Sequence, residues 1–306
     1  MSNNKGLTLT MIFHASSANY GESLSNVSVL KKFTAADGHQ YTYISRQAIR
    51  HNIAEQMGAN TAVLTAKGSG AKKVIQYADD ETIEDRLELD LFGYMKTNQS
   101  TKKKYKTLKR SAPIRISNAV AQSPYQSDYD FLTNLDFAKR YLESDQNKKD
   151  KDLSPNIAQS EIDSAFYIYT ISIDLDRIGI DDNEDLTIDN DARAARIDKF
   201  LNTVEYLYRD IKGRREDLKP LFAIGGIYEV KNPFFANAVH MNDHTINLES
   251  IKDILDDPEV KEHTESAMIH QIFSNEADIE KTLQPLSMTK FFNNLKKKVN
   301  EYYANL

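Results

Sequence analysis

The sequence predicts an α+β protein with a ferredoxin-like core, in which an antiparallel sheet is backed by two helices. This prediction depends on element order, because the chain reads strand, helix, strand, strand, helix, strand once intervening segments are set aside. Alternating polar and apolar residues indicate the strands, and apolar residues three and four positions apart indicate the helices. The expected core elements are residues 6–14, 45–57, 86–95, 165–176, 191–211 and 220–230.

The first strand and helix have the clearest patterns. In residues 6–14, GLTLTMIFH, apolar side chains alternate with threonines, so one face of the strand is expected in the core. Residues 45–57 carry an apolar stripe at helical spacing. Ser45 stands where an N-cap hydroxyl accepts a hydrogen bond from the first turn, and Gly58 is expected to end the helix.

The other core elements follow the same patterns. Residues 86–95, RLELDLFGYM, are expected to form a strand because leucines alternate with other residues. Residues 165–176, AFYIYTISIDLD, predict a strand with an aromatic and aliphatic face, and a helix at 191–211 follows and ends before Gly213. Residues 220–230, PLFAIGGIYEV, predict a further strand that two glycines interrupt.

Residues 1–306 are expected to form a single elaborated domain. Residues 96–160 are interpreted as an insertion into the core, with a helix expected near 130–142, and residues 245–306 as a largely helical C-terminal part. No apolar run approaches the roughly 18 residues that span a bilayer, and the first residues do not resemble a secretory leader. We therefore expect neither membrane insertion nor export.

Composition favours an ordinary globular protein, with 40% hydrophobic and 27% charged residues. There are no cysteines, which excludes disulfides, thiolate metal sites and cysteine nucleophiles and fits a reducing cytoplasm. A net charge of −6 argues against a general polyanion binder. However, residues 96–115 contain eight basic residues and no acid, so the chain can still bind a nucleic acid locally.

The charge order of the helix at 45–57 is unusual. Arg46 and Arg50 lie one turn apart at the end that carries the positive half of the helix dipole, and the first acid is Glu55. This order costs roughly a few tenths of a kcal/mol per charge unless an anion lies there. Two arginines at a helix N-terminus predict a phosphate site. The alternative is two solvated arginines on an exposed turn.

Five separated segments resemble one known family. In chain order they are GLTLTMIFHASSANYGE, YTYISRQAIR, LDLFGYM, APIRISNAVAQSPYQSDYDFLTN and FAIGGIYEVKNPFFANAV. On these segments the sequence resembles the backbone subunit of Cascade, the RNA-guided interference complex of type I CRISPR systems. Within that family it is similar to the DevR-like branch of type I-B.

The resemblance implies a ferredoxin-like core with inserted loops, among them a thumb-like hairpin that kinks the guide RNA. It also implies a non-catalytic, CRISPR RNA-binding subunit that needs no cofactor and acts in antiviral defence. The expected partners are the guide RNA, target DNA, further copies of the chain and the other Cascade subunits. Cleavage belongs to a recruited helicase–nuclease in this family.

Guides of differing sequence must be held through phosphates, sugars and stacking rather than base edges. The related RNA-recognition fold binds nucleotides on an open sheet face, and paired glycines in a strand let another backbone approach closely. A flexible cationic arm over RNA or the displaced DNA strand is expected from Lys102, Lys103, Lys104, Lys106, Lys109 and Arg110. The expected RNA-binding residues are Asn19, Tyr20, Ser45, Arg46, Gln47, Arg50, Lys102, Lys103, Lys104, Arg110, Arg115, Ser117, Asn118, Gly225 and Gly226.

Plainer interpretations of these residues stay open. Asn19 and Tyr20 also fit an ordinary turn residue and a half-buried tyrosine. Gly225 and Gly226 also fit a simple β-bulge. The lysine-rich segment also fits a solvated basic loop.

A metal-dependent RNA endonuclease is the rival interpretation. Asp174 and Asp176 are two residues apart on one face of the expected strand, a spacing that places two carboxylates around one Mg²⁺. A strand end that enters an acidic loop explains them as well, and no third ligand stands out. His240 and His244 have helical spacing but lie in an expected loop, so we predict no metal site and no catalytic residue. A regulatory role, which the DevR-like name suggests, is a third interpretation.

Overall fold

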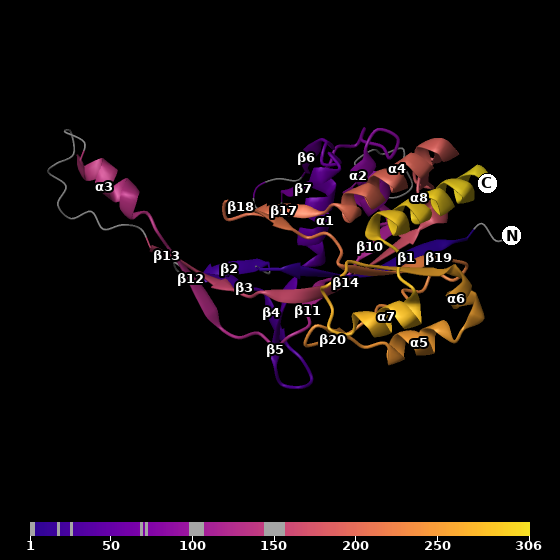
Figure 1. The fold of residues 1–306 in the computed structure, drawn as a ribbon. Coiled ribbons are helices and arrows are strands. Elements are labelled where there is room, and N and C mark those ends of the chain that lie inside the picture. Colours follow the sequence, from indigo (N-terminus) through magenta and orange to yellow (C-terminus); the bar gives the residue numbers. More distant parts are fainter. Residues whose placement is uncertain are drawn as a thin grey trace.

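The computed structural model describes residues 4–16, 19–24, 27–67, 70, 73–97, 107–143 and 157–306 (Figure 1). Its helices are α1 (Arg46–Gln56), α2 (Leu87–Phe92), α3 (Leu135–Glu143), α4 (Asn190–Glu205), α5 (Glu249–Leu255), α6 (Pro258–His263), α7 (Glu276–Leu283) and α8 (Met288–Ala304), with a 3₁₀ turn, η2, at Leu175–Arg177. Its strands are β1 (Gly6–Ala15), β2 (Tyr20–Leu24), β3 (Val27–Leu30), β4 (Lys32–Thr34), β5 (Gln40–Ile44), β6 (Leu64–Lys67), β7 (Val74–Tyr77), β8 (Tyr94–Thr97), β9 (Thr107–Arg110), β10 (Ile114–Ile116), β11 (Ala119–Ala121), β12 (Asp128–Thr133), β13 (Ile157–Ile162), β14 (Ala165–Asp174), β15 (Ile180–Asp181), β16 (Leu186–Thr187), β17 (Tyr208–Ile211), β18 (Arg214–Asp217), β19 (Phe222–Tyr228), β20 (Met241–Asn242), β21 (Thr245–Ile246) and β22 (Thr264–Met268).

The main sheet of the described residues has eight strands in the order β22-β19-β1-β14-β11-β5-β4, with β10 also paired to β14. The long central strand β1 runs antiparallel to both β14 and β19. In Figure 1, α1, α4 and α8 lie on one side of this sheet, and α5, α6 and α7 lie on the other. The fold is therefore a mixed α/β architecture with helices on both faces of an antiparallel sheet.

Each face of the sheet has its own hydrophobic core. Leu9 and Met11 of β1 face the core beneath α4 and α8, whereas Ile12 packs with Phe222 and Ile224 in the core on the α5–α7 side. The strand predicted at 6–14 is present, but the expectation that only one face is covered is wrong. The polar side chains on the second face misled the interpretation, because buried threonines satisfy one another there: Thr10 Oγ1 lies 2.9 Å from Thr170 Oγ1.

Residues 86–95 form helix α2 and the start of β8, so the predicted core strand is wrong. Leu89 and Leu91 are buried, but Asp90 between them is buried as well. Alternating leucines fit either element over so short a run, and LELDLF contains good helix formers and no β-branched residue. The helix ends at Gly93.

The expected insertion at 96–160 contributes to the core sheet. Its residues Ile114–Ile116 and Ala119–Ala121 form β10 and β11, which pair with β14 where the misassigned strand was expected. The predicted helix near 130–142 is replaced in its first part by β12, and α3 follows.

Two further predictions were correct only in part. Helix α4 begins as expected but ends at Glu205, because the chain then forms the hairpin β17–β18 around Lys212 and Gly213. Gly213, which was interpreted as the end of the helix, thus lies in the turn of this hairpin. The C-terminal part is mostly helical, although Thr264–Met268 forms β22, the edge strand beside β19.

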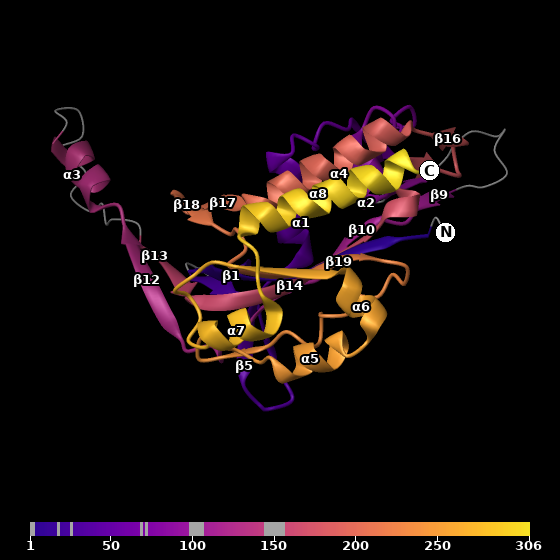
Figure 2. The ribbon, with the colours of Figure 1, turned by 45° about the vertical axis from the view of Figure 1, so that its right-hand side comes forward.

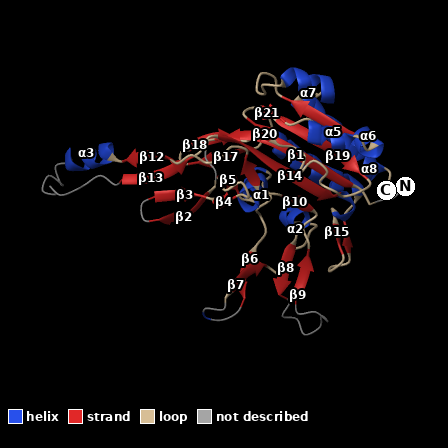
Figure 3. Ribbon diagram, turned by 90° about the horizontal axis from the view of Figure 1, so that it is seen from below, coloured by secondary structure: helices blue, strands red, loops and turns tan. Residues whose placement is uncertain are grey.

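Several elements project from this body. In Figure 2, β12, α3 and β13 extend away from the sheet; we call these described residues, 128–143 and 157–162, the arm. Figure 3 shows the hairpins β6–β7 and β8–β9 projecting at another side. Within the described residues, no helix is long and apolar enough to cross a membrane.

Candidate nucleic-acid interface

Three polar side chains fix the positive end of α1. Ser45 caps the helix, because its Oγ accepts a hydrogen bond from the N–H of Ala48 at 3.3 Å. Asn19 Oδ1 accepts from the Oγ and N–H of Ser45 at 2.7 and 3.3 Å, and Asn118 Oδ1 accepts from the N–H of Arg46 at 2.9 Å. Segments distant in sequence therefore determine where this helix begins.

A hollow of about 340 Å³ lies beside the first turn of α1, and we call it the arginine pocket. Arginines from two separate segments contribute to it together with apolar side chains from α2 and β10. The lining residues are Arg46, Gln47, Arg50, Phe92, Ala112, Ile114, Arg115 and Ile116. Four of the predicted RNA-binding residues, from two separate stretches of the sequence, thus meet at one site.

Two of the three arginines have acidic partners. Arg50 Nη2 lies 3.3 Å from Glu88 Oε1, and Arg115 Nη2 lies 2.9 Å from Asp174 Oδ2 while 52% of the Arg115 side chain is exposed. The Arg46 side chain is exposed. Three guanidinium groups and two carboxylates leave the site net positive, and the dipole of α1 adds about half a positive charge.

Glu88 is shared with a second group. Burial and, next, the hydrogen bond to Glu88 raise the pKa of Tyr77 to about 12. The phenol is therefore protonated at neutral pH, and its O–H donates a hydrogen bond to the Glu88 carboxylate. A carboxylate that is shared in this way fixes Arg50 at the rim of the arginine pocket.

Two further predicted contacts, Ser117 and Tyr20, make hydrogen bonds within the protein. Ser117 Oγ accepts from the N–H of Thr170 at 2.9 Å and donates to the carbonyl of Asn118 at 3.0 Å. Tyr20 donates its hydroxyl to the carbonyl of Glu161 at 3.1 Å, and the ammonium of Lys212 lies 4.2 Å from the Tyr20 ring centroid. One face of the ring predicted to stack on a base is thus covered by Lys212.

Comparison with protein families identifies the chain. The sequence profile described as "CRISPR-associated negative auto-regulator DevR/Csa2" matches residues 7–249, a range that includes every residue of the arginine pocket. The chain belongs to the DevR/Csa2 family. A comparison of this DevR/Csa2 protein with curated protein sequences gave no match.

Solved structures share the fold of this DevR/Csa2 protein. One, described as "CRISPR RNA-guided surveillance complex", has a TM-score of 0.56 and 12% identity over 94% of this chain and 99% of that chain. Another, described as "CRISPR RNA-guided surveillance complex, pre-nicking", has a TM-score of 0.57 and 12% identity over 95% of this chain and 100% of that chain. At this identity the similarity concerns the fold alone.

Arg110 does not belong to an exposed cationic arm in this DevR/Csa2 protein, so that prediction is wrong. Its side chain is only 3% exposed and its Nη2 lies 2.8 Å from Asp90 Oδ1. It also donates to the carbonyls of Leu89 and Ile180, at 3.1 Å each. The sequence shows a run of positive charge, but only the tertiary structure places the buried Asp90 carboxylate beside Arg110. Lys102, Lys103, Lys104 and Lys106 lie outside the described residues.

Gly225 and Gly226 do allow a close approach, but of the protein's own backbone. A Cβ on Gly225 would lie 2.0 Å from the carbonyl oxygen of Thr8, and one on Gly226 would lie 2.0 Å from that of His263. Both glycines are buried in β19. The expectation that an RNA chain crosses the sheet here is therefore wrong, because β1 and the end of α6 occupy that space.

The acidic pair of the rival interpretation is divided between different partners. Asp174 ends β14 and pairs with Arg115 and, at 3.6 Å, with Arg177. Asp176 lies in the 3₁₀ turn η2 rather than on the strand, and its Oδ1 contacts the ammonium of Lys231. The group of three potential metal ligands found among the described residues contains neither aspartate.

Phe92 is a pocket residue that sequence reasoning missed. The Arg50 guanidinium lies 4.7 Å from the centroid of its ring, a cation–π contact that orients the arginine. The signal was the aromatic residue directly before Gly93, at the end of a short helical segment. Because residues 86–95 were interpreted as a strand, this position was not connected with α1.

Replacing Ser45 with alanine is expected to lower the free energy of unfolding by about 1 kcal/mol, because the helix loses its N-cap and Asn19 loses a hydroxyl donor. Urea denaturation monitored by circular dichroism measures this. Ser287→Ala is the matched control, since Ser287 caps α8 with a 3.4 Å hydrogen bond. We expect the larger loss for Ser45→Ala, and equal losses would contradict the role of the Asn19–Ser45 link.

Proposed function

We propose that this chain is the guide-RNA-binding backbone subunit of a type I-B Cascade complex and has no catalytic activity of its own. The arginine pocket at the N-terminus of α1 carries this proposal, together with membership of the DevR/Csa2 family. The solved structures with a similar fold are described as CRISPR RNA-guided surveillance complexes, which agrees with such a role.

The topology of the sheet supports a ferredoxin-like core. Four neighbouring strand positions, β19, β1, β14 and then β10 with β11, are antiparallel and follow the order fourth, first, third, second along the chain. Helix α1 precedes the second position and α4 follows the third. This is the connectivity expected of a split β-α-β unit. RNA would bind beside α1 rather than on the sheet face, because helices cover both faces.

The chemistry of the arginine pocket suits a sugar–phosphate chain. Guanidinium groups bind phosphate oxygens in bidentate fashion, and the free N–H groups at a helix start favour anions. Neither feature depends on base identity, so one site can hold guides of any sequence. Apolar Phe92, Ile114 and Ile116 line the same hollow and would contact the ribose or a base face.

The exposed apolar surface of the arm favours the proposal that several copies assemble on one guide. It extends from the body and carries apolar side chains that are unusually exposed for a monomer. These are Tyr129 (46%), Phe131 (63%), Leu132 (70%), Leu135 (50%) and Phe137 (68%). In α3, only Ala138 is buried. We propose that the arm is the thumb of this subunit and packs on the next copy.

Replacing Phe137 with glutamate is expected to weaken association between copies by about 1–2 kcal/mol, or roughly 5- to 30-fold, because an exposed aromatic anchor is lost. Mass photometry on RNA long enough for several copies measures the distribution of assemblies. Lys139→Ala changes the charge of α3 by the same amount without removing an apolar side chain. Assemblies of unchanged size with Phe137→Glu, on RNA that is still bound, would contradict the proposed role of the arm.

Purification from cells that express a CRISPR array tests the whole proposal. We expect the chain to retain RNA of one discrete length, visible on a denaturing gel and as an increased ratio of nucleic-acid absorbance to protein absorbance. Incubation with Mg²⁺ should leave that RNA intact. Magnesium-dependent cleavage that Asp174→Asn abolishes would favour the endonuclease instead, and a monomer that stays free of nucleic acid would contradict the guide-RNA-binding role.

A further inference from the structure

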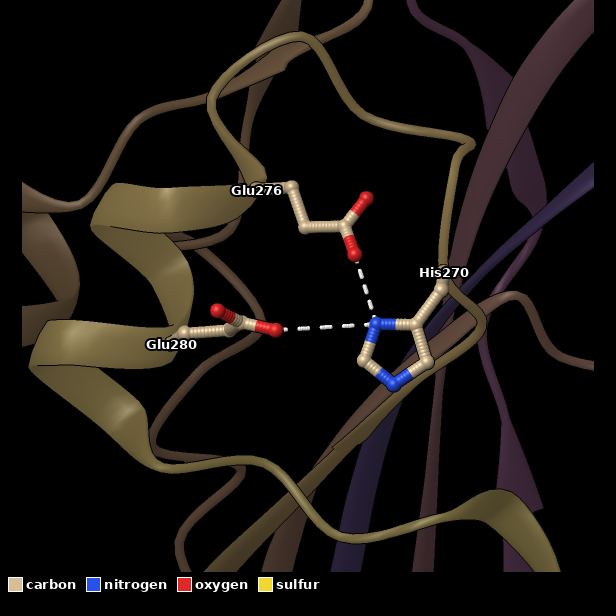
Figure 4. Close-up of side chains that lie close together, drawn as sticks. All are labelled: His270, Glu276 and Glu280. Carbon is tan, nitrogen blue, oxygen red and sulfur yellow. Dashed lines mark hydrogen bonds and ion pairs between the residues drawn. The ribbon is translucent and has the colours of Figure 1, made fainter.

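A histidine and two glutamates converge away from the arginine pocket, on the α5–α7 side of the sheet. Figure 4 shows the carboxylates of Glu276 and Glu280 directed at the same ring nitrogen of His270. Nδ1 of His270 lies 2.6 Å from Glu276 Oε1 and 3.6 Å from Glu280 Oε1. One ligand atom from each residue lies within 4.8 Å of the others.

Local structure holds these three side chains together. His270 follows β22, the edge strand of the main sheet, and Glu276 is the first residue of α7. Glu280 is four residues further on, so both carboxylates lie on the same face of α7. The N–H of Gln271 donates to Glu276 Oε2 at 2.7 Å. The second oxygen of Glu276 is therefore occupied, and Oε1 is left directed at the histidine.

The charge of this cluster is not balanced by the protein. Among the described residues, the ion pairs of Glu276 and Glu280 are with His270 alone, and no lysine or arginine pairs with either. Nδ1 carries at most one proton, so it can donate a full hydrogen bond to only one of the two carboxylates. A divalent cation in place of that proton would serve both carboxylates and the ring nitrogen together.

We propose that His270, Glu276 and Glu280 bind a Zn²⁺ ion. An imidazole nitrogen and two carboxylate oxygens are ligands that zinc accepts, with bonds of about 2.0–2.2 Å and a fourth tetrahedral position for water. Such bonds place neighbouring ligand atoms roughly 3.3 Å apart, between the two separations present. The His270 and Glu280 side chains are 68% and 52% exposed, so small rotations bring them to that spacing. Mg²⁺ fits poorly, because it prefers oxygen ligands and octahedral geometry.

A bound ion would join α7 to the end of β22. The loop between them contains Phe273, which is buried in the core on this side of the sheet. The metal would thus restrain an edge of the main sheet that the arginine pocket does not touch. This role is structural and does not depend on RNA.

Titration of the intact protein with ZnCl₂, against a chromophoric chelator, tests the proposal. We expect one Zn²⁺ per chain, a higher melting temperature with the metal, and a tetrahedral absorption spectrum when Co²⁺ is used instead. Glu280→Gln should weaken binding by at least about tenfold, and His270→Ala by more, since each removes a ligand. His51→Ala is the matched control, because His51 is an exposed histidine with one glutamate partner, Glu55, at 3.7 Å.

Several outcomes would overturn the proposal. Equal Zn²⁺ affinity in the native protein, Glu280→Gln and His270→Ala would mean that the metal binds elsewhere. Competition by Mg²⁺ at similar concentrations would mean a non-specific attraction of cations to the acidic face of α7. Circular dichroism of the metal-free variants excludes misfolding as a cause of lost binding, and Glu280→Gln is the safer variant, because Glu276 also accepts the N–H of Gln271.

Discussion

Replacing Asp90 with alanine is expected to destabilise the protein by about 3–5 kcal/mol, the effect of breaking a buried ion pair. The Asp90 side chain is fully buried and accepts hydrogen bonds from Arg110 Nη2 at 2.8 Å and Arg196 Nη1 at 2.7 Å. The N–H of Gly179 donates to it at 2.8 Å. Burial lowers the pKa of the Arg110 guanidinium, and Asp90 opposes that shift. Without Asp90, a charged arginine remains inside the protein without its carboxylate.

Urea denaturation measures this loss as a lower midpoint with an unchanged slope. The matched control is Asp210→Ala, since Asp210 pairs with Arg215 at 2.9 Å on the surface, and no measurable shift is expected there. Asp90→Asn should lie between the two, because an amide oxygen still accepts from Gly179. A midpoint for Asp90→Ala equal to that of Asp210→Ala would refute a stabilising role of this carboxylate.

This buried network also matters for the arginine pocket. Asp90 lies in α2, two residues before Phe92, whose ring contacts Arg50. Arg110 is the last residue of β9. Its guanidinium donates hydrogen bonds to the carbonyl of Leu89 in α2 and to that of Arg177 after β14, so it links the β8–β9 hairpin to both segments. A weakened network would therefore disturb the pocket wall that Phe92 forms.

The sequence was most informative where local chemistry decides the structure. Capping and dipole effects act within one helical turn. The sequence could therefore predict both Ser45 as the N-cap and the absence of an acid in the first turn of α1. Strand β14 could be predicted because its long apolar pattern fits no other element. The same local signals placed Arg46 and Arg50 at the start of α1, where they line a pocket.

Long-range structure decides the rest. Nothing near Arg110 in the sequence indicates that a buried carboxylate twenty residues earlier is its partner. The covered sheet face could not be predicted locally, because the helices over it come from the far C-terminal part. The threonines of β1 also gave no sign of it, although they are buried in the structure. Arg115 was included as an RNA contact, but only the pairing of β10 with β14 brings it beside α1.

Replacing both Arg46 and Arg50 with alanine is expected to weaken binding of single-stranded RNA by roughly 10- to 100-fold, because two charge-assisted phosphate contacts are lost. The loss should be equal for RNAs of unrelated sequence, since phosphates carry no sequence information. The slope of log affinity against log salt should fall by about 1.4, or about 0.7 for each phosphate contact on a single strand. Filter binding across a salt series measures both quantities.

The control removes the same charge elsewhere: Lys290→Ala with Lys297→Ala takes two exposed cations from α8, on another part of the helical layer. If the net charge of the protein alone governs affinity, both double variants will weaken binding alike. If the arginine pocket binds the RNA, only the arginine variant will do so. Arg46→Lys with Arg50→Lys should recover the salt slope but not the full affinity, because an ammonium lacks the bidentate geometry of a guanidinium. Native affinity and native salt slope in the arginine variant would show that the arginine pocket does not bind the RNA.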